Sequence, residues 1–416
     1  MKQRKKIALV TGIILLGYLA FFIFYLIVRK GKGMGYPYGS FLFFPADRFM
    51  DFFNVNQMMC TDNPYFAFNS SYPPLILWIA KLFSILSDYQ GYDPHTIAVS
   101  HSGMASYLVF VVSFTLMIAI MLYHILKKGA DCFRTKLGML LVIPVLILTA
   151  PYIYMLDRGN YLLVALAFFM GFVCFYEENE ILAAVFLALA ASVKIYPLFF
   201  ALLYMIDRKW KKMGIFLLTG AIVSVIAMAM FVGDFYSNFY RFGVLLLGFG
   251  GGTGNPVTSV YYGVGLTSAL RFPFVVWNNN TIPESFQVMK IYLIAGTVLT
   301  LYSVWCMRHE TLFAKKLMVL SALMVFLTPN SYLYNLVYMM PAIVMYMLAK
   351  PSKKAWIDVV YGCLLSLMMI PKAYQFYMPG SLISIQVMID AGLLLLLVLF
   401  YDFFDRETWI RKVSGD

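Results

Sequence analysis

The sequence has 416 residues, of which 62% are hydrophobic and only 12% are charged, and its mean hydropathy is +0.79. Apolar runs reach the roughly 20 residues that a helix needs to cross about 30 Å of hydrocarbon, so a soluble globular class is excluded. The net charge of +12 comes mostly from Lys and Arg clusters beside apolar runs, which is the positive-inside pattern and argues against nucleic-acid binding. These clusters lie at 2–6, 127–136, 208–212, 308–316, 350–354 and 406–412.

We therefore expect an all-α polytopic membrane protein, with residues 1–416 forming one integral domain. Placing every basic cluster in the cytoplasm predicts twelve transmembrane helices, with both termini inside. The expected spans are 7–28, 101–126, 137–156, 160–176, 180–193, 196–206, 214–232, 286–307, 317–329, 332–349, 355–371 and 381–401.

The stretch from 180 to 206 is short for two helices, but Lys194-Ile-Tyr-Pro197 interrupts it. Reading it as one span would place the basic cluster at 208–212 outside. We therefore expect two short or tilted helices there.

Two long loops, 29–100 and 233–285, face outward in this topology. The segment 74–86 is apolar, is too short to cross and carries Lys81, which predicts a helix lying along the outer interface. The unusual polar residues collect on this outer side, where we expect the two loops to form the site.

Two carboxylates in the first outer loop are the candidate catalytic residues. Asp47 and Asp51 are four apart, so they share one face of the helix that Pro45 would begin. Asp47 would occupy the first turn, where a carboxylate stabilises the helix dipole. Asp51 would lie a turn further on, directly before two aromatic residues. Desolvation of its carboxylate among these aromatic side chains would make Asp51 a stronger base. The alternative is a solvated loop acid or a partner for Arg48.

Two cations are expected at the outer ends of spans. Arg158 and Lys194 are costly there unless they are paired or line a wet cavity, and they would suit a phosphate at headgroup level. The alternatives are interfacial snorkelling and, for Arg158, an ion pair with Asp157. Asn160 has the alternative role of capping the helix that follows it.

Neither a metal site nor a disulfide framework is expected. The five cysteines show no paired spacing, and the four histidines are scattered along the chain. The glycine-rich stretch 248–254 lacks the Gly-Lys-Ser/Thr ending of a phosphate loop, so we expect a flexible part of the second outer loop.

Several stretches, taken together and in order, resemble glycosyltransferase family 87 over roughly residues 40–350. They are Asp51 with its aromatic segment, Asn63-Pro-Tyr65, Ser71-Tyr-Pro-Pro-Leu75, Gly159-Asn-Tyr-Leu-Leu163, the run 184–194 ending in Ala191-Ser-Val-Lys-Ile-Tyr-Pro197, Gly254-Asn255 and Thr328-Pro-Asn-Ser-Tyr332. Those proteins are membrane enzymes of the GT-C type, and they include the polyprenyl-phosphate-mannose-dependent mannosyltransferases of phosphatidylinositol mannoside synthesis.

The resemblance implies inverting transfer of a hexose, with mannose expected, from a polyprenyl-phosphate donor to a lipid-linked or glycan acceptor. The reaction would occur on the outer face of a bacterial cytoplasmic membrane, with the lipid-linked sugar as co-substrate and no separate cofactor. Asp51 matches the catalytic acidic residue of the first outer loop, and Lys194 matches the lysine of a Lys-x-x-Pro turn. Further substrate-binding residues are expected at Tyr72, Tyr196, Asn255, Asn330, Tyr334 and Asn335. The last two stand where many members have a histidine pair.

The rival class is a secondary transporter of a small polar or lipid-linked substrate. Broken helices and intramembrane charges would be expected there as well. The absence of a detectable repeat between the two halves of the sequence favours the enzyme. A non-catalytic scaffold is the third alternative.

Overall fold

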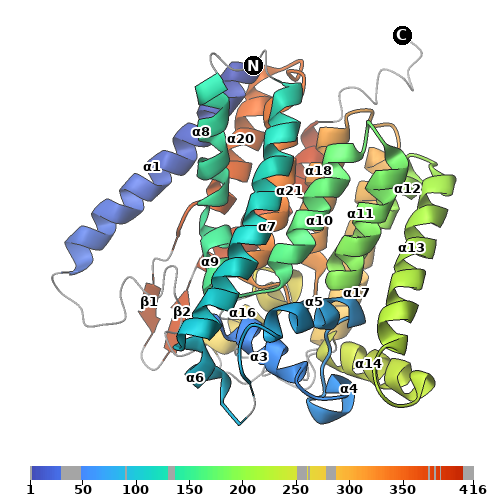
Figure 1. Cartoon of the computed structure of the whole chain (residues 1–416). Coiled ribbons are helices and arrows are strands. Elements are labelled where there is room, and N and C mark those ends of the chain that lie inside the picture. Colours follow the sequence, from blue (N-terminus) through green and yellow to red (C-terminus); the bar gives the residue numbers. More distant parts are fainter. Residues whose placement is uncertain are drawn as a thin grey trace.

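The computed structural model shows a helical bundle with a smaller layer of helices at one end (Figure 1). The structure describes residues 2–29, 48–89, 91–129, 136–250, 260, 263–277, 287–372, 375–378, 381–384 and 386–405. Two of the expected site residues, Asp47 and Asn255, lie outside these described residues.

The bundle follows the apolar runs of the sequence. Its elements are α1 (Gln3–Arg29), α7 (His101–Lys128), α8 (Lys136–Ile147), α9 (Ala150–Arg158), α10 (Leu162–Phe175), α11 (Glu180–Val193), η3 (Tyr196–Phe200), α12 (Ala201–Ile206), α13 (Trp210–Ala229), α17 (Val288–Met307), α18 (Phe313–Leu327), η4 (Leu333–Tyr338), α19 (Met339–Leu348), α20 (Ala355–Met369) and α21 (Gln386–Phe404).

Four helices in the described part of the chain are long and apolar enough to cross a membrane: α1, α7, α13 and α17. The pair α8 and α9 makes a fifth candidate, and shorter apolar helices occupy most of the other expected spans. The chain is therefore a mainly helical integral membrane protein. The number of twelve crossings stays a prediction.

Two expected spans differ from the structure. The span 137–156 is not one helix, because α8 and α9 meet at an angle of 53°. Thr149 is extended there, and Pro151 at the start of α9 has no N–H with which to continue the hydrogen bonds of α8. The span 381–401 begins too early, since strand β2 (Ser381–Ser384) pairs antiparallel with β1 (Gln375–Met378) before α21 starts.

The stretch from 180 to 206 consists of two short elements. α11 ends at Val193, Lys194 has the extended conformation (φ −137°, ψ 130°), and η3 begins at Tyr196 and continues into α12. Pro197 near the start of η3 explains the break, because it too lacks an N–H.

Ion pairs connect the helices at the end of the bundle where the N-terminus lies, which we call the basic end (Figure 1). The buried Lys6 Nζ lies 3.0 Å from Asp358 Oδ1, and Lys315 Nζ lies 2.6 Å from Asp405 Oδ2. Further pairs there are Lys128 with Glu178, Lys209 and Lys212 with Glu180, and Lys316 with Asp207. The basic clusters that the structure describes thus gather at one end, as the charge pattern predicts.

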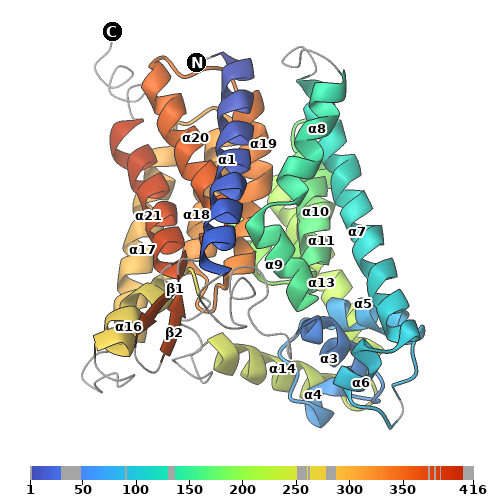
Figure 2. The same cartoon turned by 90° about the vertical axis from the view of Figure 1, so that its left-hand side faces the viewer.

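Shorter helices form a layer at the opposite end (Figures 1 and 2). They are α3 (Met50–Met58), α4 (Pro64–Ala67), α5 (Pro74–Ser84), α6 (Pro94–Ala98), α14 (Phe235–Gly250) and α16 (Leu266–Trp277). α5, the expected interfacial helix, lies across the end of the bundle and contacts α3, α7, α11 and α13. The described parts of both long loops therefore lie at the end away from the basic clusters.

Candidate active site

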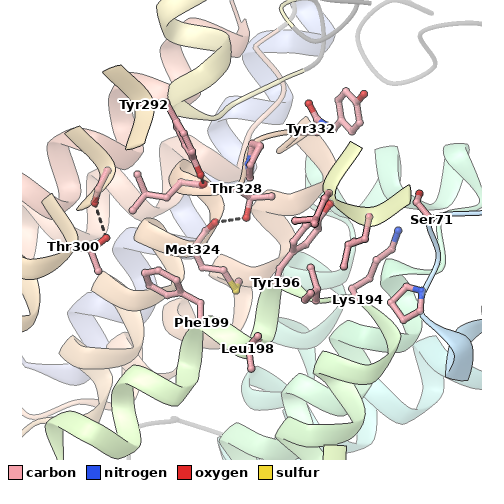
Figure 3. Close-up of a pocket in the computed structure, with 18 of the residues that line it drawn as sticks. Ser71, Lys194, Tyr196, Leu198, Phe199, Tyr292, Thr300, Met324, Thr328 and Tyr332 are labelled. Carbon is pink, nitrogen blue, oxygen red and sulfur yellow. Dashed lines mark hydrogen bonds between the residues drawn. The ribbon is translucent and has the colours of Figure 1, made fainter. Parts of the chain in front are cut away.

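A cavity of about 980 Å³ lies between this layer and the bundle. Its walls come from α3, the turn before α5, the break at Lys194, η3, α14, α17, α18 and the turn that follows α18 (Figure 3). Seven of the expected site residues line it: Asp51, Tyr72, Asn160, Lys194, Tyr196, Asn330 and Tyr334. Residues up to 283 positions apart in the sequence thus meet in one place, Asp51 at one extreme and Tyr334 at the other.

The helix that carries Asp51 begins later than expected. α3 starts at Met50, so Asp51 itself lies in the first turn, and the prediction that it lies a full turn beyond the helix start is wrong. Phe49 ends the preceding segment with φ 64°, and its N–H donates to the carbonyl oxygen of Asp157 at 2.7 Å. The case for Asp51 therefore depends on its place in the cavity rather than on its lack of a helix-capping role.

Asn160 holds the carboxylate of Asp51. The Asn160 Nδ2 group donates to Asp51 Oδ2 at 2.6 Å, while Asn160 Oδ1 accepts from the N–H of Leu162 at 2.8 Å. The second bond satisfies the N–H of the first residue of α10, so Asn160 has a role close to the capping alternative, although the N-cap position itself is Tyr161. The Asn160 amide therefore makes both bonds, and the bond from Leu162 to its Oδ1 orients its Nδ2 group toward Asp51.

A close backbone approach brings these two residues together. Gly159 has φ 63°, a conformation that L side chains rarely adopt. A Cβ atom there would lie 2.7 Å from the carbonyl oxygen of Phe49 and 2.9 Å from Cβ of Phe52. Glycine at this position thus allows the start of α3 to pack directly on the turn between α9 and α10.

Lys194 supplies the positive charge of the cavity. It lies in the turn between α11 and η3, and its side chain extends toward the turn that carries Ser71 (Figure 3). Its Nζ atom lies 4.7 Å from the centre of the Tyr72 ring, and no carboxylate of the described residues forms a salt bridge with it. Burial lowers the pKa of Lys194 to about 8, although the nearby Asp51 raises it. Such a cation is suited to an anionic ligand.

Tyrosines surround this charge. Tyr72, Tyr196, Tyr332 and Tyr334 all line the cavity. The rings of Tyr332 and Tyr334 are 5.6 Å apart, and Tyr334 also stacks on Tyr154 at 5.8 Å. Their hydroxyl groups offer hydrogen bonds, and their ring faces offer apolar contact to the C–H groups of a sugar.

Two expected residues lie outside the lining of the cavity. Arg158 is buried in the last turn of α9, and the neighbouring Asp157 forms an ion pair with Arg48 at 3.6 Å. Asn335 is buried behind the wall, where its Nδ2 group donates to Ser331 Oγ at 3.2 Å. Asn335 thus supports the turn after α18 from within.

A family model of glycosyltransferase family 87 matches residues 71–329, more than half of the chain. The chain belongs to glycosyltransferase family 87. A search of curated proteins finds no match. The matched range contains Tyr72, Asn160 and Lys194, whereas Asp51 and Tyr334 lie outside it. The assignment makes this chain a membrane glycosyltransferase and decides against the transporter class.

The second long loop of this glycosyltransferase is attached to the wall of the cavity. Gly263 forms an isolated β-bridge with Tyr332, and the N–H of Val264 donates to the carbonyl oxygen of Ser331 at 2.7 Å. Thr267 Oγ1 donates to the carbonyl oxygen of Pro329. Both long loops therefore meet at the site, the first through Asp51 and the second through this bridge.

Sequence reasoning missed part of the lining. Ser71, Thr328 and Tyr332 stand inside motifs that pointed to the family, so they could have been chosen. The apolar wall had no such signal, because its residues look like any others in a membrane span. That wall consists of Ile195, Leu198, Phe199, Leu246, Leu247, Leu293, Gly296, Leu301, Met324 and Leu327, together with the polar Tyr292, Thr297 and Thr300.

Among the residues that the structure describes, no group of three or more His, Cys, Asp or Glu side chains is placed to hold a metal ion. The charged groups of the lining are Asp51 and Lys194. One can accept a proton and the other can neutralise an anion. This pair is the chemistry that the described part of the site offers to a glycosyl transfer.

Proposed function

We propose that this glycosyltransferase moves a hexose, with mannose the expected sugar, from a polyprenyl-phosphate donor to a lipid-linked or glycan acceptor. The observation that carries the proposal is the meeting of Asp51 and Lys194 in one cavity with a largely apolar wall. A sugar bound to a lipid phosphate requires an apolar surface for its chain and a cation for its phosphate.

Lys194 is the proposed phosphate contact. Its ammonium group, which forms no salt bridge with a carboxylate in the described part of the chain, attracts the phosphodiester of the bound donor and stabilises the added charge on the phosphate that leaves. The hydroxyl groups of Tyr72 and Tyr196 add neutral hydrogen-bond donors on the same side of the cavity. Tyr334 stands in place of a histidine found in many family members, so at this position a phenol hydroxyl replaces an imidazole as the hydrogen-bonding group.

Asp51 is the proposed general base. Its carboxylate accepts the proton of the acceptor hydroxyl while that oxygen attacks the anomeric carbon of the sugar. The bond between the anomeric carbon and the phosphate oxygen breaks on the opposite face, and its electron pair leaves with the polyprenyl phosphate. The configuration at the anomeric carbon is thereby inverted. Asn160 keeps the carboxylate in place during this step.

We propose that the site faces the outer side of a bacterial cytoplasmic membrane. The support is the charge distribution, because Lys and Arg clusters are retained in the cytoplasm and the cavity lies at the other end of the bundle. A donor carried by a lipid is consistent with this side, where nucleotide sugars are absent.

The test is transfer by the purified full-length protein. We expect it to use polyprenyl-phosphate mannose, with a membrane lipid extract as the source of acceptor, and the new product to be larger by one hexose in mass spectrometry. Two other donors are compared with it: polyprenyl-phosphate glucose, which changes the sugar, and a nucleotide-linked mannose, which changes the carrier. Transfer from the nucleotide-linked sugar alone would contradict the proposal, and transfer from the glucose donor alone would correct the sugar.

A further inference from the structure

The cavity is open on one side to the region where lipid would lie. Three leucines that line it are also strongly exposed: Leu247 on α14 at 77%, and Leu293 and Leu301 on α17 at 58% and 64%. α17 is long and apolar enough to cross a membrane, so exposed leucines on its outer face are placed toward hydrocarbon. The same side chains therefore contact both the cavity and the bilayer.

One side of this opening is a stripe along α17. Leu293, Thr297 and Leu301 follow one another at intervals of four residues and so share one helix face. The stripe extends about 12 Å along the helix, at 1.5 Å per residue. Gly296 lies beside it and allows α17 to pack closely on α18, since a Cβ atom there would lie 3.3 Å from Leu327 Cδ2.

The floor of the opening comes from α18 and η3. Figure 3 shows Met324, Phe199 and Leu198 around the same space as Tyr292 and Thr300. The floor is apolar, and Lys194 stands at its inner end, one residue before Ile195, which also lines the cavity. An apolar slot that ends at a cation matches a lipid chain joined to a phosphate.

The other side of the opening is α14, which carries an exposed aromatic face. Tyr236 and Tyr240, four residues apart, are 82% and 72% exposed. The buried Asn238 fixes the opposite face, because its Oδ1 accepts from Asn63 Nδ2 at 2.7 Å. Arg241 donates to Asn69 on the same side of the layer. Tyrosines on one face and tethered polar groups on the other are typical of a helix in the membrane interface.

The exposed face of α14 continues the lipid-facing surface of α13. The end of α13 exposes Val225, Ile226 and Met230, and α14 follows after a tight turn in which Gly233 has φ 105°. Figures 1 and 2 place α14 across the end of the bundle, within the layer of short helices. The bilayer is therefore the partner that covers this face.

We propose that the side of the cavity between α14 and α17 is a lateral portal, through which the chain of a lipid phosphate passes from the bilayer while its phosphate reaches Lys194. The proposal rests on the lipid-phosphate donor proposed above and adds the route and the residues that contact the chain. The portal residues are Leu246, Leu247, Leu293, Thr297 and Leu301. The proposal requires that a bulky side chain introduced on the α17 stripe weaken binding of the lipid chain and leave binding of the phosphate unchanged.

The test compares two probes that share a phosphate and differ in the length of the chain. Undecaprenyl phosphate reaches through the portal, whereas dimethylallyl phosphate has five carbons and stays near Lys194. We expect Thr297→Trp to weaken binding of undecaprenyl phosphate to the full-length protein at least tenfold, and binding of dimethylallyl phosphate less than threefold. Leu301→Trp should act in the same way, which provides a second reading should one variant fold poorly.

The matched control is Ile294→Trp. Ile294 lies on the same helix and is also strongly exposed, but it does not line the cavity, so neither probe should bind differently. If both Thr297→Trp and Leu301→Trp bind undecaprenyl phosphate as the unmodified protein does, the portal is wrong while the donor class stands. If the unmodified protein binds neither probe, the donor class is wrong and the portal is withdrawn with it.

Discussion

The Nδ2 group of Asn160 donates a hydrogen bond to Oδ2 of Asp51 at 2.6 Å, across two segments that are 109 residues apart. Asn160 is itself held by the N–H of Leu162, so its amide cannot rotate without losing the bond to the first residue of α10. A carboxylate held in this way has one oxygen fixed by the protein. Its orientation toward a substrate is therefore set by the turn between α9 and α10.

Replacing Asn160 by alanine tests this positioning role. We expect kcat to fall by up to about 10²-fold, because a misplaced catalytic group loses alignment with the reacting atoms, while the KM for the donor changes little. Asn179→Ala is the matched control, since the Asn179 side chain also accepts from a first-turn N–H, that of Leu182 at 3.0 Å, but does not line the cavity. Both variants should lose about 1 kcal/mol of stability. Equal activities in the two variants would leave Asn160 a structural cap only.

Asp51→Asn should abolish turnover without unfolding the protein. Loss of a general base costs about 10²–10⁴-fold in rate, whereas loss of a carboxylate from the first turn of α3 costs about 1 kcal/mol or less of helix stability. Transfer assays and thermal unfolding on the same preparation separate the two effects. Asp47→Asn should keep most of its activity. The roles of Asp47 and Asp51 are exchanged if the Asp47 variant is the inactive one.

Lys194→Gln should raise the KM for the donor at least tenfold, since it removes the charge that attracts the phosphate and keeps a polar side chain only one atom shorter. Lys81→Gln is the control: Lys81 lies on α5, in the same layer as α3, but it donates to the carbonyl oxygen of Met59 at 2.7 Å and does not line the cavity. Unchanged donor KM in the Lys194 variant would remove this residue from the phosphate site.

The pH dependence of donor binding should report on Lys194. Burial lowers its pKa to about 8, so the ammonium form that attracts phosphate is present below that pH and is lost as the pH rises through it. Donor affinity should therefore decrease between about pH 7 and pH 9. Lys194→Arg should bind donor with a flat profile over this range, because a guanidinium stays protonated. A profile that is the same in the lysine and arginine proteins would assign the titration to another group.

The sequence identified the polar half of the site better than the apolar half. Lys194 was visible because a cation beside a proline interrupts an apolar run, and its break in the helix is confirmed by the structure. The stripe from Leu293 to Leu301 was not visible, because a leucine that lines a lipid-accessible cavity and one that packs against another helix have the same sequence signal.

The start of α3 shows a second reason for failure. Pro45 predicted a helix start that would put Asp47 in the first turn, but the helix described by the structure begins at Met50. Phe49 takes a left-handed conformation and donates to Asp157, a residue more than 100 positions away. Local propensity cannot anticipate a boundary that is set by such a distant contact.

The bend between α8 and α9 determines how far this part of the chain extends. A straight helix from Lys136 to Arg158 would be about 34 Å long, longer than the hydrocarbon layer is thick, and would carry Gly159 and Asn160 out toward water. The 53° bend at Thr149 and Pro151 shortens that reach and returns the turn to the start of α3. Pro151, which touches no substrate in the proposed mechanism, thereby helps to set where the turn that holds the carboxylate of Asp51 lies.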